Sequence, residues 1–153
     1  MSPFNAFMFI QGMETLHLRM KEHSANGQKV AEHLSKHSMV ERVAYPGTSS
    51  GLPKERADKY LSNGCGGLLG FEIKGGHEAG KKFINSLEML YHVANIGDSR
   101  SLAIHPASTT HSQLNEEELA SGGISSGYIR LSIGLEHIDD ILADIDQALA
   151  KAE

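Results

Sequence analysis

The stretch from residue 128 to the carboxyl end constrains the fold of this chain more than any other part of its sequence. Apolar and polar side chains alternate over residues 128–133, which predicts a β-strand with Ile129, Leu131 and Ile133 on its apolar face. The residues that follow carry apolar side chains at helical spacing, at Ile138, Ile141, Leu142, Ile145 and Leu149. A strand and a helix that are each apolar on one side favour a layered fold with a shared core.

The remaining elements follow one another without a regular alternation of strand and helix. Helices are predicted behind the start signal Ser2-Pro3, after Thr15, over residues 54–62 and over residues 79–87. Strands are predicted over residues 40–45, 69–73 and 91–96. Residues 97–113 are polar and are predicted to form one long loop, of a length that usually carries function or is disordered. This order of elements predicts an α+β fold.

The first predicted helix is apolar around most of its circumference, with large side chains at Phe4, Phe7, Met8, Phe9, Ile10 and Met13. One layer of neighbouring protein cannot cover all of them. We therefore expect residues 3–13 to contact more protein than this chain supplies, and the isolated chain to self-associate. The alternative is that the helix folds back on the chain's own sheet.

Composition excludes several classes of function. The chain has 14 basic and 19 acidic side chains in 153 residues, which argues against binding to a nucleic-acid backbone and gives no support to an electrostatic membrane anchor. No apolar run approaches the length of a transmembrane helix. The single cysteine, Cys65, rules out an internal disulfide framework and fits a reducing compartment. Together with the lack of a signal peptide, these features predict a cytoplasmic location.

Arg130 is the strongest candidate for a binding residue. It lies on the face of its predicted strand opposite to the apolar residues, and the strand is expected to be central in the sheet. The planar guanidinium matches a carboxylate with two parallel hydrogen bonds. A structural ion pair with a nearby acid, or simple exposure to solvent, is the alternative for this residue.

Other candidate chemistries are weaker. His92, His105 and His111 match no ligand spacing of a strong metal motif, so no metal site is predicted. The Ser, His and Asp residues of the 97–113 segment are not preceded by the Gly-x-Ser-x-Gly turn of a hydrolase. The glycine-rich stretch from Gly64 leads into a strand and not into a helix, unlike a phosphate-binding loop.

Three segments taken together resemble one known family. They are Ser2-Pro-Phe-Asn-Ala6, residues 95–111 with their His-Pro-Ala-Ser-Thr-Thr-His stretch, and residues 123–136 with Ile-Arg-Leu-Ser-Ile-Gly-Leu-Glu. These are similar to the carboxy-terminal domain of the Cys/Met-metabolism enzymes that use pyridoxal phosphate. The resemblance implies a small, mainly antiparallel sheet packed against helices, as in fold-type I enzymes of this cofactor. It also implies that residues 1–153 form this substrate-side domain, with residues 1–35 as a helical connection to a cofactor-binding domain.

The resemblance also implies an activity and a set of roles. The Asn-Ile-Gly-Asp form at Asn95 is most similar to O-acetylhomoserine sulfhydrylases, which replace acetate with sulfide or a thiol in homocysteine and methionine synthesis. Related lyases tend to carry serine at that position. By the same resemblance Arg130 holds the α-carboxylate of the amino-acid substrate, Asn95 lies beside that carboxylate, and Thr110 orients the pocket wall.

The sequence departs from the family at the cofactor. None of its lysines lies in the Ser-x-Thr-Lys motif that carries pyridoxal phosphate, and the larger cofactor-binding domain is absent from these residues. We therefore expect pyridoxal phosphate in the intact enzyme, no covalently held cofactor and no catalytic residue in this chain, and an inactive isolated chain. Two alternatives stay open: a non-enzymatic module for carboxylate binding or oligomerisation, and a metal-binding protein.

Overall fold

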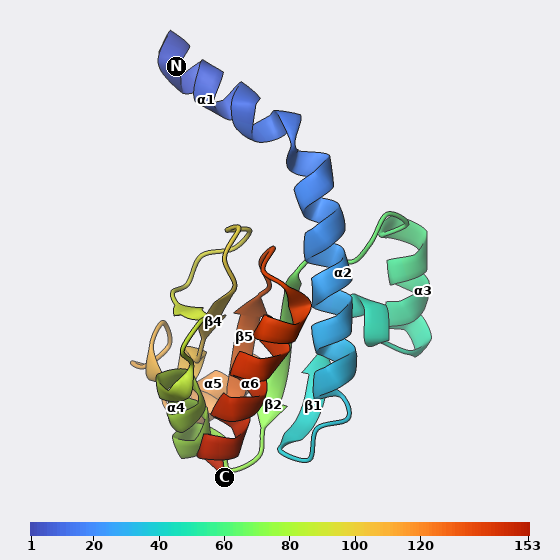
Figure 1. The fold of residues 1–153 in the computed structure, drawn as a ribbon. Helices are drawn as coiled ribbons and strands as arrows, with labels where there is room; N and C mark the ends of the chain where they lie inside the picture. The colour runs from blue at the N-terminus through green and yellow to red at the C-terminus, as the bar shows by residue number, and fades with distance from the viewer.

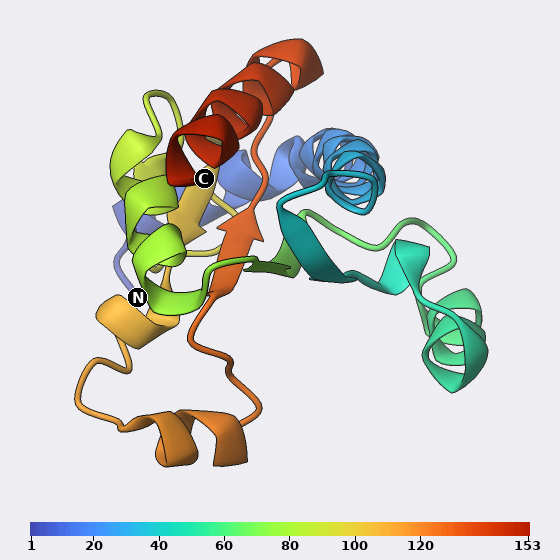
Figure 2. The ribbon, with the colours of Figure 1, turned by 90° about the horizontal axis from the view of Figure 1, so that it is seen from below.

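The computed structural model describes residues 1–153 and contains one five-stranded sheet in the order β1-β2-β5-β4-β3 (Figures 1 and 2). The strands are β1 (Val40–Ala44), β2 (Leu68–Ile73), β3 (Tyr91–His92), β4 (Leu102–Ile104) and β5 (Tyr128–Ser132). All neighbouring strands are antiparallel except β3 and β4, which are parallel. The predicted α+β class and mainly antiparallel sheet are confirmed.

The helices are α1 (Pro3–Glu14), α2 (Leu16–Leu34), α3 (Gly51–Tyr60), α4 (Gly76–Ser86), α5 (Glu116–Ser121) and α6 (Ile138–Ala152). Figure 2 shows α2, α4 and α6 together on one side of the strands. The core lies between these three helices and the sheet, and its fully enclosed side chains include Leu34, Phe83 and Leu149.

The central strand β5 has the two faces that its sequence predicts. Ile129, Leu131 and Ile133 are completely buried in the core. Tyr128 and Arg130 point to the opposite face and are half-buried. This second face carries no helical layer comparable to the first (Figure 2).

The prediction of one polar loop over residues 97–113 is wrong. The segment contains strand β4, which pairs with β5 on one side and β3 on the other. All three residues of β4, Leu102–Ile104, are buried. Because a strand this short that is buried on both faces has no alternation of polar and apolar side chains, the periodicity gave no signal for it. The predicted strand over residues 91–96 is correspondingly only two residues long.

Helix α1 stands away from the rest of the molecule (Figure 1). Ser2 caps it, with its Oγ accepting a hydrogen bond from the Asn5 backbone N–H at 3.2 Å, and Pro3 occupies the first turn as predicted. None of its residues is buried, and Phe4 is 69% exposed. The helix therefore does not fold back on the chain's own sheet. No helix of the chain combines the length and the apolar character that crossing a bilayer requires.

Candidate carboxylate-binding site

Arg130 projects from the middle of the sheet with part of its hydrogen-bonding capacity unused. Gly70 of β2 and Ile104 of β4 lie directly opposite it. Its Nη2 donates to the backbone carbonyl of Asn95 at 3.3 Å. Its Nε is buried and has no hydrogen-bond partner. A buried donor of a charged group without a partner is costly, so the site favours an anion that accepts from this edge of the guanidinium.

The structural ion pair that competed with this interpretation is not formed. Glu72, an acid on the same face of the sheet, pairs with Arg42 at 2.6 Å between Oε1 and Nη2. No carboxylate of the chain lies within ion-pair distance of the Arg130 guanidinium. The positive charge of Arg130 therefore has no acidic partner within the chain.

Tyr128 forms a wall beside Arg130. Its ring lies over Gly70, where a Cβ would come within 2.0 Å of the phenol oxygen, so only glycine gives it room. Burial raises the pKa of the Tyr128 phenol above its ordinary value, although the charge of Arg130 opposes this. The phenol is therefore neutral at physiological pH and adds no negative charge that would compete with an anionic ligand.

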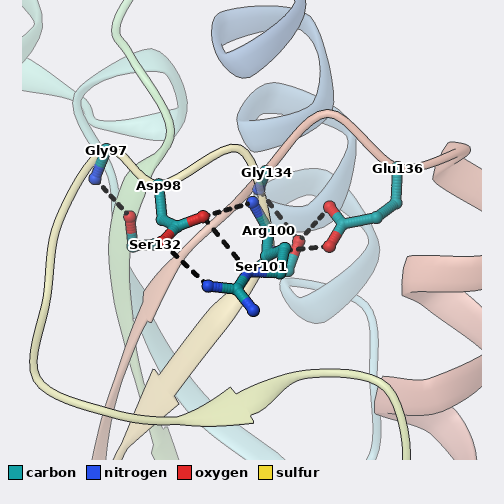
Figure 3. Close-up of polar contacts among 7 residues, drawn as sticks. All are labelled: Gly97, Asp98, Arg100, Ser101, Ser132, Gly134 and Glu136. Carbon is teal, nitrogen blue, oxygen red and sulfur yellow. Dashed lines mark hydrogen bonds and ion pairs between the residues drawn. The ribbon is translucent and has the colours of Figure 1, made fainter.

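A segment that we call the strap, residues 95–101, runs along the far end of β5 and its continuation (Figure 3). Its first contact is the hydrogen bond that the Asn95 carbonyl accepts from Arg130 Nη2. Its second is the Gly97 N–H, which donates to Ser132 Oγ at 3.1 Å. Both contacts join residues 35 positions apart, so the strap and β5 run in the same direction.

The strap ends in a carboxylate contact. Glu136 accepts the Ser101 N–H on Oε1 at 2.6 Å and the Ser101 hydroxyl on Oε2 at 2.9 Å (Figure 3). The same hydroxyl accepts the Gly134 N–H at 2.9 Å. A Cβ at Gly134 would lie 2.4 Å from the Ser99 carbonyl oxygen, which explains the glycine at this close approach. Every second residue from 130 to 136 thus forms a hydrogen bond with the strap.

A local turn shapes the middle of the strap. Asp98 Oδ1 accepts the Arg100 N–H at 3.0 Å and also contacts the Arg100 guanidinium. The Arg100 backbone N–H, followed by its side chain, holds the pKa of Asp98 below its ordinary value. The guanidinium also lies over the Tyr91 ring, 4.6 Å from the ring centre. Because these charges satisfy one another, they leave Arg130 as the free cation of this region.

The structure brings together two of the three predicted site residues. Asn95 meets Arg130 through its backbone carbonyl, and its side chain is exposed. Thr110 is also exposed, and its Oγ1 lies 2.8 Å from His111 Nδ1. No hydrogen bond joins Thr110 to Arg130 or to Asn95, so its role as a pocket wall stays a prediction.

The histidines considered for a metal have different surroundings. His105 is fully buried, with Nδ1 2.8 Å from Ser108 Oγ and Nε2 2.7 Å from the Ser126 carbonyl. Burial lowers the pKa of His105 below its ordinary value, so it is a neutral structural group. His92 is exposed, and no three His, Cys, Asp or Glu side chains of the chain gather as metal ligands would.

Sequence reasoning missed Ser101, Ser132 and Glu136 as parts of this site. A signal was present, because the period of two that places Arg130 and Ser132 on one face continues to Gly134 and Glu136. The predicted loop over residues 97–113 concealed the partner segment, since a loop gives no register against a strand.

Comparison with known proteins identifies the chain's relatives. The family model for Cys/Met metabolism pyridoxal-phosphate-dependent enzymes matches residues 1–150. The chain belongs to this family. It is 56% identical over 149 residues to the O-acetyl-L-homoserine sulfhydrylase of Leptospira meyeri, and that match covers 97% of the chain. It is 47% identical over 151 residues to the L-methionine gamma-lyase of Treponema denticola, covering 99% of the chain.

A solved structure supports the fold. A Campylobacter jejuni protein described as an O-acetylhomoserine (thiol)-lyase matches with a TM-score of 0.89 and 46% identity, over 98% of this chain and 36% of that one. That protein carries N′-pyridoxyl-lysine-5′-monophosphate at position 205. The chain spans about a third of the length of the curated relatives it matches, 34% for the Leptospira protein and 37% for the Treponema protein.

The described residues fit a planar carboxylate better than they fit the phosphate of a cofactor. The unpartnered Arg130 Nε suits a planar carboxylate. The glycine-rich segment before β2 does not form a phosphate cradle, because it enters a strand and its Gly66 N–H already donates to Ser24 Oγ at 3.1 Å. Pyridoxal phosphate supplies the electron sink of this family's reactions.

Proposed function

We propose that this chain is the substrate-side domain of an O-acetylhomoserine sulfhydrylase, in which Arg130 binds the α-carboxylate of the amino-acid substrate. The observation that carries the proposal is the Arg130 guanidinium, half-buried on the face of the sheet opposite to the helical layer, with its buried Nε unpartnered and no acid of the chain beside it. In the intact enzyme the acetate on the substrate's γ-carbon is replaced by sulfide or a thiol, in the synthesis of homocysteine and methionine.

The roles of the neighbouring residues follow from their positions. The Asn95 carbonyl fixes one nitrogen of the guanidinium and leaves the remaining N–H groups for the carboxylate. Tyr128 and the strap border the guanidinium, and Thr110 orients the pocket wall. The Asn-Ile-Gly-Asp form at Asn95 supports a sulfhydrylase over a methionine lyase. A cytoplasmic setting belongs to the same proposal, since Cys65 is a free thiol.

We propose further that residues 1–35 connect this domain to the cofactor-binding domain, and that α1 contacts that domain and a neighbouring subunit. The exposed apolar side chains of α1 support this, because nothing in the chain covers them. The isolated chain lacks a lysine in the motif that carries the cofactor, so we expect it to be inactive and to self-associate through residues 3–13.

The test of the carboxylate role replaces the matched segment of the Leptospira meyeri sulfhydrylase by this chain and compares Arg130→Lys with the unmodified chimera. A lysine offers one point charge and loses the two-pronged contact. We expect kcat/KM for O-acetylhomoserine to fall roughly 30- to 1000-fold. Arg42→Lys, on the same face but paired with Glu72, is the matched control and should change kcat/KM less than about threefold.

A chimera whose kcat/KM stays within about threefold of the parent after Arg130→Lys would contradict the proposal. The alternative of a non-enzymatic module makes a different prediction about the gene. For an enzyme domain, the coding sequence immediately upstream should encode the Ser-x-Thr-Lys segment in the same reading frame. For a separate module, it should not.

A further inference from the structure

We infer that Glu136 and Ser101 are positioning residues for the carboxylate site, acting by holding the strap against β5 so that Asn95 fixes the Arg130 guanidinium. This inference rests on the proposed function, and it concerns two side chains that do not touch the substrate themselves. Figure 3 shows the contacts of Ser101 with Glu136 and Gly134 and the contact of Gly97 with Ser132.

The first part of the strap, residues 95–97, has no fixed path of its own. The chain leaves β3 at His92 and enters β4 at Leu102, and these two strands are paired neighbours, with Tyr91 opposite Leu102. A loop whose two ends are adjacent in space can project in many directions. Residues 93–97 are exposed, so no core packing holds this part of the loop in place.

Anchors on one side of the strap remove that freedom. Ser132 holds the Gly97 N–H, the Leu135 N–H donates to the Ser99 carbonyl at 2.8 Å, and Glu136 holds Ser101 through two hydrogen bonds. Asn95 is only two residues beyond the anchor at Gly97, so its carbonyl is confined to within about 7 Å of that point. The anchors thereby decide where the acceptor for Arg130 Nη2 lies.

The Glu136 contact is the strongest of these anchors and is electrostatically isolated from the site. It uses both carboxylate oxygens on one residue, at 2.6 and 2.9 Å, and hydrogen bonds to an ionised acceptor are stronger than neutral ones. Both oxygens point at Ser101, so the negative charge is satisfied there and does not pair with Arg130. An acid can therefore organise an anion site without occupying it.

The expected effect is on recognition of the carboxylate. In the chimera described above, the informative quantity is the ratio of kcat/KM for O-acetylhomoserine to kcat/KM for its α-carboxamide. Glu136→Ala should lower this ratio about tenfold, mainly through KM, because the guanidinium loses its fixed direction. Glu136→Gln keeps an acceptor for the Ser101 N–H and should restore the ratio to within about threefold of the parent.

The matched control is Asp144→Ala. Asp144 is a buried carboxylate that, like Glu136, accepts backbone N–H groups from a loop, at Glu88, Met89 and Leu90, but it lies in the helical layer. The Asp144→Ala substitution should lower the melting temperature and leave the ratio unchanged. If Asp144→Ala lowers the ratio as much as Glu136→Ala does, Glu136 acts only through stability. That result would overturn the inference.

The outcomes separate this inference from the proposed function. If Arg130→Lys leaves the ratio unchanged, the carboxylate role itself fails. If Arg130→Lys lowers the ratio strongly and Glu136→Ala leaves it unchanged, only the positioning role fails. Amide hydrogen exchange on the 153-residue chain gives a second measurement that needs no activity. Glu136→Ala should increase exchange at Gly97 and Ser101 about tenfold or more, and unchanged protection at both amides would overturn the inference.

Discussion

Helices α1 and α6 are 12 and 15 residues long, and both are rich in apolar residues. They differ in how far these residues are buried. Helix α6 buries six side chains, including Ile141, Ile145 and Leu149, whereas α1 buries none. The difference lies in the arrangement of the apolar residues and not in their number. A single stripe, as in α6, matches one neighbouring surface, and the chain supplies that surface. The apolar residues of α1 surround the helix, and such a helix needs several surfaces, which this chain does not have.

The largest expected effect concerns self-association through α1. The double change Phe4→Ser and Phe7→Ser removes two large exposed side chains, at 69% and 54% exposure. Burial of each contributes roughly 1.5–3 kcal/mol, so dissociation should become easier by a factor of at least about 100. Light scattering at micromolar concentration measures this. Leu52→Ser, an exposed change outside α1, is the control and should have no effect. A monodisperse monomer of the unmodified chain would refute the idea.

The next largest effect is expected when a buried apolar side chain is removed from α6. Ile145→Ala removes a completely buried side chain from the core and should lower the free energy of unfolding by about 2–5 kcal/mol. Ile10→Ala in α1 should change it by less than about 0.5 kcal/mol at concentrations where the chain is monomeric. Urea unfolding of both variants tests the comparison directly. Similar losses in the two helices would show that α1 packs against its own chain.

The third effect concerns Asp144, a buried polar residue of α6, and the dependence of stability on pH. Burial alone raises the pKa of Asp144, but the N–H groups of Glu88, Leu90 and Met89 outweigh it and hold the net pKa below its ordinary value. A lowered folded-state pKa contributes stability above the unfolded-state value, about 3.9, and this is lost as pH falls through the folded-state pKa. Asp144→Asn should cost about 1–3 kcal/mol at pH 7. The difference from the unmodified chain should shrink below about pH 4, and a constant difference down to pH 2 would contradict this assignment.

The smallest effect is expected at the amino end of α1. Ser2→Ala removes the cap on the Asn5 N–H, a change that costs a helix about 0.5–2 kcal/mol. Because α1 packs against nothing in the chain, this loss should remain local and global unfolding should shift by less than about 0.5 kcal/mol. Amide exchange should speed up in the first turn of α1 alone. Faster exchange in α6 as well would show that the two helices are coupled.

The same reasoning explains which features the sequence made predictable. The faces of β5 and α6 were predictable because each packs one apolar side into the core, and the same alternation placed Arg130 on the opposite face of β5. Strand β4 was not predictable, because Leu102–Ile104 is buried on both faces and carries no alternation. The Glu136 contact depends on a partner 35 residues away, and no local pattern records such a distance. Thr110 rested on resemblance alone, and its role stays a prediction.

The constant separation of 35 residues along the strap has a consequence for how the molecule folds. Each of these hydrogen bonds closes a long loop, and the entropy of that closure must be overcome before the bond contributes. Their partners lie on β5 and its continuation, so the strap can dock only after β5 is in place in the sheet. A chain halted just before that step would have its full core and no organised site, so the ability to recognise a carboxylate is acquired in the last stage of folding.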